Sequence, residues 1–289
     1  MVLSLIKTCP AKINLFLEVK NKRKDGYHDI ESLMTFCEFG DLLSVKKSQK
    51  FVFRVNGPFS KELFGKYNLI EEAKKKLEVL YNREFKVDVL LTKNLPIASG
   101  MAGGSSNAAT FIRSIKEIFN LEDVLGFDDL LLSLGADVPF CYYGKTALVN
   151  GIGEKLKFVS IKEQYYFLLI NPKIEISTQR VFKSLNQSRK KEEENSHKLD
   201  EIASFRFFSK RKNHLESQAI HQSKKIEEIL NFLNSIGGTL FSRMTGSGAT
   251  CFALFDNLVN VESAEAYAKE KFDNYWIKSS KLINSIKYI

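Results

Sequence analysis

The stretch that decides the fold lies in the first half of the chain and reads Pro96-Ile97-Ala98-Ser99-Gly100-Met101-Ala102-Gly103-Gly104-Ser105-Ser106. An alternating apolar segment at residues 87–91 precedes it, and an apolar stripe with helical spacing at residues 108–119 follows it. Small residues allow backbone N–H groups to approach an anion closely. The start of a helix adds unpaired N–H groups and a partial positive charge at the same place. Strand, glycine loop and helix start together predict a site for a phosphate group.

The same stretch has a second interpretation, in which it is only a tight connection and Ser105 or Ser106 caps the following helix. It lacks the Gly-x-x-x-x-Gly-Lys-Ser/Thr pattern of the Walker loop and the Gly-x-Gly-x-x-Gly pattern of dinucleotide-binding folds. No His-Arg-Asp or Asp-Phe-Gly tripeptide indicates a protein kinase. Phosphate binding therefore needs support from other segments.

Outside this loop, alternation predicts strands and a spacing of about 3.6 residues predicts helices. We expect strands at residues 12–19, 87–91, 147–150, 166–169 and 249–255, and a strand pair at 42–46 and 51–55. We expect helices at residues 69–80 with Asn68 as N-cap, at 108–119, at 226–233 ending near Gly237, and at 263–272. The mixture predicts an α+β fold, with a boundary near Val159 that divides it into residues 1–158 and 159–289.

Length and composition indicate a globular protein of about two domains. The 289 residues are about twice the length of a typical domain. With 44% hydrophobic and 27% charged residues, the chain is excluded from the collagen-like, disordered and disulfide-stapled classes. No run approaches the ~20 apolar residues of a membrane span, and the N-terminal residues lack a long apolar stretch. We therefore expect a cytoplasmic protein that contacts no membrane. We also expect a monomer or weak homodimer.

Lysine and arginine number 43 against 34 aspartate and glutamate residues, which gives a net charge of +9. Because these cations are spread along the chain, they favour an anionic small substrate or a generally basic surface over nucleic acid. Cys9, Cys37, Cys141 and Cys251 are far apart and form no Cys-x-x-Cys pair. This spacing predicts reduced, buried thiols and neither a disulfide framework nor a structural metal site.

Residues 186–217 differ from the rest of the chain because they are polar and highly charged, with Arg189-Lys190-Lys191-Glu192-Glu193-Glu194 among them. Such a block buries too little apolar surface to order firmly by itself. We expect a mobile surface loop or a solvated helix in this segment.

Three further segments carry charged or small polar residues at the ends of predicted elements. Lys12 and Asn14 are two residues apart on a strand and so point to one face, although a solvent-facing edge lysine is the alternative. Asp137 follows an apolar run, where a carboxylate near a lysine is a candidate proton acceptor and a cap or turn is the alternative. The glycines of Thr245-Gly246-Ser247-Gly248-Ala249 predict close approach to a phosphate or to the first glycine loop, with a plain turn as the alternative.

Taken in this order, the segments resemble the GHMP kinases, a superfamily with an N-terminal motif, a central Pro-x-x-x-Gly-Leu-Gly-Ser-Ser type ATP loop and a glycine-rich third motif. Segments 10–17, 26–28, 103–109, 134–139 and 246–254 are similar to its members that act on 4-diphosphocytidyl-2-C-methyl-D-erythritol. The resemblance implies an N-terminal ATP-binding lobe, a C-terminal α/β sandwich-like lobe and an active site in the cleft between them. It also implies ATP-dependent phosphorylation of the substrate's 2-hydroxyl group in the non-mevalonate isoprenoid pathway.

The resemblance also implies roles for individual residues. Asp137 would match the catalytic aspartate and Lys12 its partner at the reacting centre. The stretch 96–106 would match the loop that holds the ATP triphosphate, with Mg²⁺ bridging the phosphates and Ser106 as a candidate ligand. Asn68 would lie near the adenine.

For the acceptor, the resemblance implies a cytidine pocket in which Tyr27 stacks, His28 forms hydrogen bonds and Phe182 supplies the opposite stacking face, with Asn14 beside the substrate. Some positions depart from the common pattern. Alanine or serine stands at 98, 99 and 102, where glycine is frequent, and Met34 stands where an aromatic residue can line the pocket.

Two alternatives to this substrate stay open. The first keeps the fold and the ATP loop but takes another small alcohol, such as phosphomevalonate or homoserine. The second is a non-catalytic regulator that uses its basic surface to bind a macromolecule. The presence of both Lys12 and Asp137 argues against a regulator, because a protein without catalysis has no need of that pair.

Overall fold

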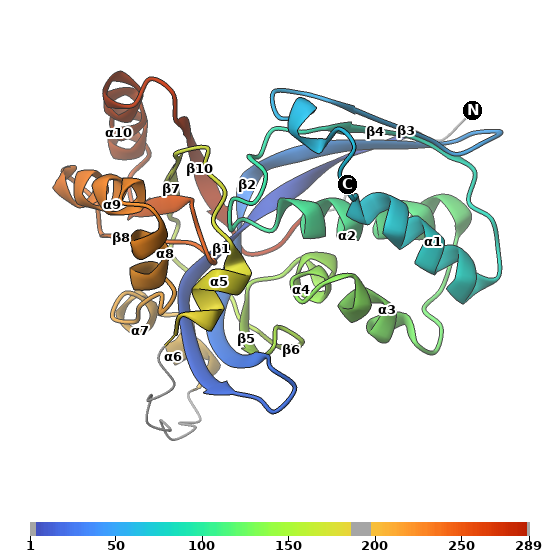
Figure 1. Ribbon diagram of the computed structural model, residues 1–289, viewed down its shortest axis with the longest axis horizontal. Helices are drawn as coiled ribbons and strands as arrows, with labels where there is room; N and C mark the ends of the chain where they lie inside the picture. The colour runs from blue at the N-terminus through green and yellow to red at the C-terminus, as the bar shows by residue number, and fades with distance from the viewer. Residues whose placement is uncertain (1–3, 186–197, 288–289) are drawn as a thin grey trace.

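The computed structural model describes residues 4–185 and 198–287 (Figure 1). These residues form a ten-stranded sheet with the order β3-β4-β2-β10-β7-β9-β8, to which β1 and β5 add by pairing with β2, and β6 by pairing with β5. The strands are β1 (Ser4–Lys22), β2 (His28–Lys47), β3 (Val52–Asn56), β4 (Val87–Thr92), β5 (Ala147–Gly151), β6 (Lys155–Phe158), β7 (Tyr166–Asn171), β8 (Phe241–Met244), β9 (Cys251–Phe255) and β10 (Trp276–Ile283).

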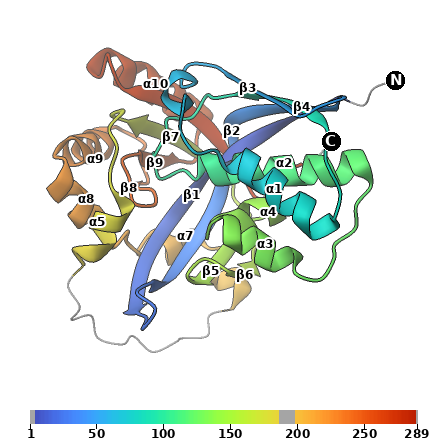
Figure 2. The same cartoon turned by 45° about the vertical axis from the view of Figure 1, so that its right-hand side comes forward.

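The described helices pack around this sheet. They are η1 (Lys61–Leu63), α1 (Leu69–Tyr81), α2 (Gly103–Phe119), α3 (Phe127–Leu134), α4 (Val138–Tyr143), α5 (Thr178–Lys183), α6 (Leu199–Ile202), α7 (Phe205–Phe208), α8 (Glu216–Gln222), α9 (Lys225–Ser235) and α10 (Leu258–Lys271). The long antiparallel ribbon of β1 and β2 runs between α1–α4 on one side and α5, α8 and α9 on the other (Figure 2). The α+β architecture expected from the sequence is thus confirmed. Within the same ranges, none of the helices combines the length and apolar character needed to cross a bilayer.

The N-terminal half has its own hydrophobic core, between β2, β4 and helices α1–α4. Val87, Val89 and Leu91 alternate with half-buried residues along β4, as the sequence predicted, and all three are fully buried. Ala73 and Phe111 bring the buried faces of α1 and α2 into the same cluster. This core holds the N-terminus of α2 next to the end of β4.

Strands form near residues 42–46 and 51–55 as expected, but the prediction that these two strands pair with each other is wrong. β2 and β3 do not pair with each other, because β4 lies between them, antiparallel to β2 and parallel to β3. Parallel neighbours need a crossover connection, and α1 supplies it between β3 and β4. Local periodicity marked each strand but could not indicate this order.

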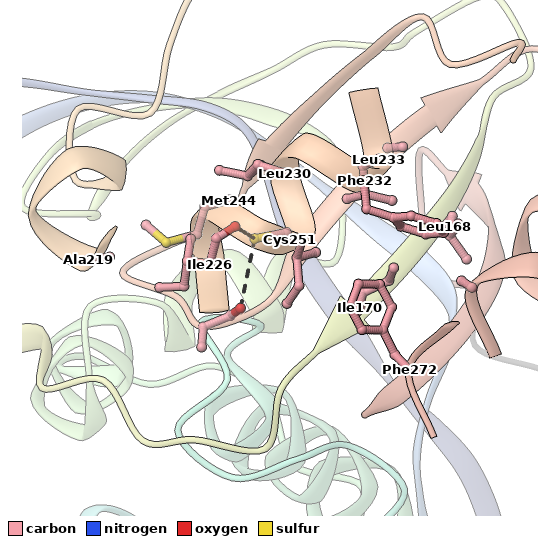
Figure 3. Close-up of a cluster of buried hydrophobic side chains, with 14 of the residues drawn as sticks. Leu168, Ile170, Ala219, Ile226, Leu230, Phe232, Leu233, Met244, Cys251 and Phe272 are labelled. Atoms are coloured by element: carbon pink, nitrogen blue, oxygen red, sulfur yellow. Dashed lines mark hydrogen bonds between the residues drawn. The ribbon is translucent and has the colours of Figure 1, made fainter. Parts of the chain in front are cut away.

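The C-terminal half packs helices α8–α10 against β7, β8 and β9. Figure 3 shows the centre of this second core, where Ile226 and Leu230 of α9 meet Leu168, Ile170 and Cys251 of the sheet. α10 begins earlier than predicted, at Leu258, because Asn257 caps it by accepting hydrogen bonds from two backbone N–H groups.

The charged segment 186–217 is only partly described, and residues 186–197 lie outside the described ranges. From Lys198 onward the expectation of a solvated segment is wrong. Short helices α6 and α7 bury Ile202 and Phe208, which pack in a cluster with Phe16 and Phe252. The aromatic residues of α7, and not the neighbouring charges, decide the conformation here, because their burial offsets the cost of ordering the chain.

Strand β10 joins the two halves at the middle of the sheet. Trp276–Lys281 pairs with β7, while Leu282 and Ile283 pair with Cys37 and Phe36 of β2. The last described strand therefore connects the sheet of the N-terminal half with that of the C-terminal half.

Candidate active site

A cavity of about 590 Å³ lies where the two halves of the chain meet. The N-terminal half lines it with β1, the glycine loop and the start of α2, and the C-terminal half with α5 and the second glycine loop. The predicted residues at its wall are Lys12, Asn14, Asn68, Pro96, Ile97, Ala98, Ser99, Gly100, Ala102, Gly103, Gly104, Ser105, Asp137 and Phe182. Met101 and Ser106 are buried and do not line it.

The two glycine loops pack directly against each other. A Cβ atom on Gly100 would lie 2.4 Å from the Thr245 carbonyl oxygen, and one on Gly246 would lie 2.6 Å from the Gly100 oxygen. The Thr250 N–H also donates a hydrogen bond to the Ser99 carbonyl. Of the two contacts predicted for Thr245–Ala249, approach to the first glycine loop is therefore confirmed, and only glycine allows it.

The start of α2 differs from the prediction that Ser105 or Ser106 caps the helix. The helix begins at Gly103, after Ala102 in the left-handed conformation with φ of 53°, and no side chain caps it. Its first N–H groups therefore lack a capping side chain at the edge of the cavity, where they can bind an anion. Ala98 is also left-handed, with φ of 49°. This backbone explains why glycine is favoured at both positions.

The structure brings Lys12 and Asp137 together. Lys12 Nζ lies 3.3 Å from Asp137 Oδ2, and the side chain of Lys12 is 4% exposed while that of Asp137 is 32% exposed. The backbone N–H of Lys12 donates to the carbonyl of Met101, which fixes the lysine to the glycine loop. A buried cation and a partly exposed carboxylate thus face the same cavity, beside the helix start that can hold phosphate.

Asn14 lies next to Lys12, as the two-residue spacing predicted. Lys12 Nζ donates a hydrogen bond of 2.9 Å to Asn14 Oδ1, and Asn14 is fully buried. Asn68 caps α1 by accepting a hydrogen bond from the Ile70 N–H, so its predicted capping role is confirmed while its side chain also reaches the cavity.

Sequence reasoning missed a second lysine at the cavity. Lys93 Nζ lies 2.6 Å from Asp41 Oδ2, and both side chains are buried. The other carboxylate oxygen, Oδ1, accepts hydrogen bonds from the N–H groups of Asn94 and Leu95, at the entrance to the glycine loop. A Cβ atom on Gly103 would lie 3.2 Å from Lys93 Nζ, which places this cation beside the start of α2. The sequence offers only one signal for this lysine, which is its place between the strand at 87–91 and the glycine loop.

Two buried oxygens at the start of α2 have no hydrogen-bond partner among the described residues. They are Ser106 Oγ and Asn107 Oδ1, in side chains of residues that are 1% and 4% exposed. Buried polar atoms are normally paired, so an unpaired one next to a cavity is available to a ligand. Asn107 lines the cavity and was not predicted.

The predicted cytidine-pocket residues are only partly brought together. The rings of His28 and Phe182 lie 5.4 Å apart, and Phe182 reaches the cavity. Tyr27 is 61% exposed in the turn between β1 and β2, and neither it nor His28 lines the cavity. Burial, with a smaller effect of Lys22, lowers the pKa of His28 below 6.5, so its ring is uncharged at neutral pH.

Comparison with known proteins places this geometry in a family. The model of the GHMP kinase N-terminal domain matches residues 68–145, and that of the C-terminal domain matches residues 192–274. The chain is 35% identical over 276 residues to 4-diphosphocytidyl-2-C-methyl-D-erythritol kinase of Chelativorans sp. (strain BNC1), with 94% of each chain covered. The chain belongs to this GHMP kinase family.

A further relative and two solved structures are similar to this chain over most of its length. The enzyme of the same name from Clostridium novyi (strain NT) is 34% identical, covering 92% of this chain and 96% of its own. A crystal structure of 4-(cytidine 5'-diphospho)-2C-methyl-D-erythritol kinase superposes with a TM-score of 0.78 at 25% identity, covering 96% of this chain and 99% of that one. Homoserine kinase from Cytophaga hutchinsonii shares the fold, with a TM-score of 0.67 at 14% identity, covering 98% and 96% of the two chains.

Proposed function

We propose that the protein transfers the γ-phosphoryl group of ATP to the 2-hydroxyl group of 4-diphosphocytidyl-2-C-methyl-D-erythritol, a step of the non-mevalonate isoprenoid pathway. One observation carries this proposal: Lys12 and Asp137 lie 3.3 Å apart at the wall of the cavity that the glycine loop and the start of α2 also line. The choice of acceptor is supported by the curated relatives, which carry the same name and match this chain over 92% to 94% of its residues.

The nucleotide would lie along the glycine loop. The N–H groups at the start of α2, together with the positive end of that helix, would hold the phosphates. Lys93 adds a buried positive charge beside Gly103. Asn68 lines the cavity at the N-terminus of α1 and would face the adenine.

Mg²⁺ is the expected cofactor beside ATP, and the residues at the start of α2 fit it. Mg²⁺ prefers oxygen ligands and keeps several waters, so it needs few protein ligands. Asn107 Oδ1, in a residue that lines the cavity, is a buried oxygen without a partner among the described residues, and Ser106 Oγ, one residue earlier and just behind the cavity wall, is a second one. When bound, the ion would neutralise charge on the β- and γ-phosphates. The described residues contain no cluster of three or more His, Cys, Asp or Glu that could hold a metal without the nucleotide.

Asp137 and Lys12 would act at the reacting atoms. The 2-hydroxyl oxygen forms a bond to the γ-phosphorus, the bond between that phosphorus and the β,γ-bridging oxygen breaks, and ADP leaves with the electron pair. Asp137 accepts the hydroxyl proton, a role that contributes about 10²–10⁴ in rate. Lys12 Nζ, 3.3 Å from Asp137 Oδ2, holds the carboxylate in place and offsets negative charge on the transferring group.

The acceptor would occupy the end of the cavity near Phe182. Phe182 offers an aromatic face to the cytosine ring, and the uncharged His28 beside it can donate and accept hydrogen bonds. Tyr27 would complete the pocket from its exposed turn, and Asn14 would lie beside the erythritol unit.

Two coarser proposals concern the whole protein. A cytoplasmic location is supported by the cysteines Cys9, Cys37, Cys141 and Cys251, all of which are free and buried. We also propose that the protein is a monomer or weak homodimer.

A coupled assay of ADP release tests the proposed function. The purified protein is given ATP and Mg²⁺ with the cytidine substrate, with phosphomevalonate, or with homoserine. We expect turnover with the cytidine compound, whereas turnover only with another alcohol would change the acceptor, and turnover with none of them would favour a regulator. Asp137→Asn should lower kcat by about 10²–10⁴ and leave ATP affinity unchanged, and an undiminished kcat would remove Asp137 from the mechanism.

A further inference from the structure

Asn14 is held by a closed set of hydrogen bonds that reaches from β2 to the second glycine loop. Its Nδ2 group donates to Ser32 Oγ at 2.8 Å, and its backbone N–H donates to Thr245 Oγ1 at 2.9 Å. Thr245 Oγ1 in turn donates to Asn14 Oδ1 at 3.3 Å. Ser32, Thr245 and Asn14 are all 0% exposed. No role was predicted for either hydroxyl group from the sequence.

The protons in this set can be placed without ambiguity. A lysine ammonium only donates, so the Asn14 atom that faces Lys12 Nζ must be the oxygen. Ser32 Oγ donates its proton to the Phe16 carbonyl at 2.5 Å, so it can only accept from Asn14 Nδ2. The two arguments give the same orientation of the Asn14 amide.

We propose that Ser32 and Thr245 are positioning residues that act on Lys12 through Asn14. They fix the Asn14 amide with its oxygen toward Lys12 Nζ, and this acceptor holds the ammonium 3.3 Å from Asp137. Without them, the amide can rotate and present an NH₂ group, which repels the ammonium. A displacement of about 1 Å in a reacting group can cost about 10²-fold in rate. The inference rests on the proposed function, because it concerns the reacting centre of that reaction.

Thr245 has a second consequence, because it belongs to the loop that packs against Gly100. The same residue therefore contacts the lysine network through its side chain and the ATP loop through its backbone. The second glycine loop therefore positions both Lys12 and the loop at which the nucleotide would bind.

Thr245→Val tests the proposal, because valine keeps the shape and loses the hydroxyl. At saturating substrates we expect kcat to fall about 10- to 100-fold, with KM for ATP unchanged. Thr245→Ser restores the hydroxyl and should restore kcat, and Ser32→Ala should behave like Thr245→Val. Thr35→Val is the matched control on β2, since the buried Thr35 hydroxyl bonds to that of Thr146, outside this network, and it should retain the parent kcat.

A second measurement separates positioning from a general loss of structure. In a Lys12→Met background, adding Thr245→Val should change the residual rate less than about twofold, because coupled residues do not act additively. A further tenfold loss in that background would overturn the proposal.

Crystal structures of Thr245→Val and Thr245→Ser keep the inference testable whether or not the expected substrate is turned over. We expect a displaced Lys12 ammonium, with a Lys12–Asp137 distance above the parent's 3.3 Å, in the valine variant alone. An unchanged Lys12–Asp137 distance in Thr245→Val would refute the positioning role. Absence of turnover by the parent protein would count against the proposed function and not against this geometry.

Discussion

Replacing Asp41 with asparagine tests how strongly a buried ion pair stabilises the wall of the cavity. The ammonium of Lys93 lies 2.6 Å from Asp41 Oδ2, and the two side chains are 4% and 0% exposed. Asparagine keeps the shape of the side chain and the Oδ1 acceptor for the N–H groups of Asn94 and Leu95. The substitution removes the negative charge and, because an NH₂ group takes the place of Oδ2, also the acceptor of Lys93 Nζ, so the Lys93 cation loses its counter-ion.

The expected loss follows from this burial. Removing one partner of a buried ion pair costs about 3–5 kcal/mol, because the remaining charge is uncompensated. Lys93 also lines the cavity, where water lowers this cost, so we expect about 3 kcal/mol in the free energy of unfolding. Adding Lys93→Met removes the unpaired charge, and the double variant should be more stable than Asp41→Asn alone.

Urea denaturation of the parent, both single variants and the double variant measures these differences through the midpoint and the slope. A loss below about 1 kcal/mol for Asp41→Asn would place the pair among the weak surface pairs and refute the reasoning. A double variant that loses the sum of the two single losses would refute it equally, because it would show that the two charges do not interact.

Three further predictions concern the loop, the pH dependence and the metal. Gly100→Ala places a Cβ atom 2.4 Å from a backbone oxygen at φ of 77°, and should lower the melting temperature and the kinase rate, whereas Gly237→Ala, with no atom within 4 Å, should change neither. Burial raises the pKa of the Glu216 carboxyl group above 4.5, so the folded protein keeps this proton to a higher pH than the unfolded chain does. The protonated carboxyl group therefore favours the folded state at low pH, and this contribution to the free energy of unfolding is lost as pH rises through the raised pKa. The denaturation midpoint of Glu216→Gln minus that of the parent should therefore increase from pH 4.5 to pH 7. A difference that stays constant over this range would contradict the raised pKa of Glu216. Ser106→Ala should raise the Mg²⁺ concentration needed for half-maximal rate by about 10-fold or more with an unchanged unfolding midpoint, and an unchanged Mg²⁺ requirement would remove Ser106 as a ligand.

The parts of the fold that depend on neighbours along the chain could be predicted from the sequence. Alternation marked β4, the cap at Asn68 marked the start of α1, and the two-residue spacing placed Lys12 and Asn14 on one face. Each of these follows from the geometry of a single element. The meeting of Lys12 with Asp137 does not, and the expectation of it came from the resemblance to a family.

Features that depend on distant partners were missed. β4 lies between β2 and β3 because of a crossover that local periodicity cannot indicate. Asp41 and Lys93 are 52 residues apart, and neither residue alone signals a buried pair. At the start of α2, the sequence suggested a serine cap, whereas the helix starts earlier and has no capping side chain. The division into residues 1–158 and 159–289 stays a prediction.

The position of β10 has a consequence for how the molecule is made. Its residues 276–283 separate β2 from β7, and these two strands are synthesised long before it. A nascent chain can collapse each half around its own core, yet the edge of β7 and the short stretch Phe36–Cys37 of β2 stay unpaired until translation reaches this strand. Unpaired strand edges can pair with another nascent chain. A chaperone that shields them would act before β10 is synthesised.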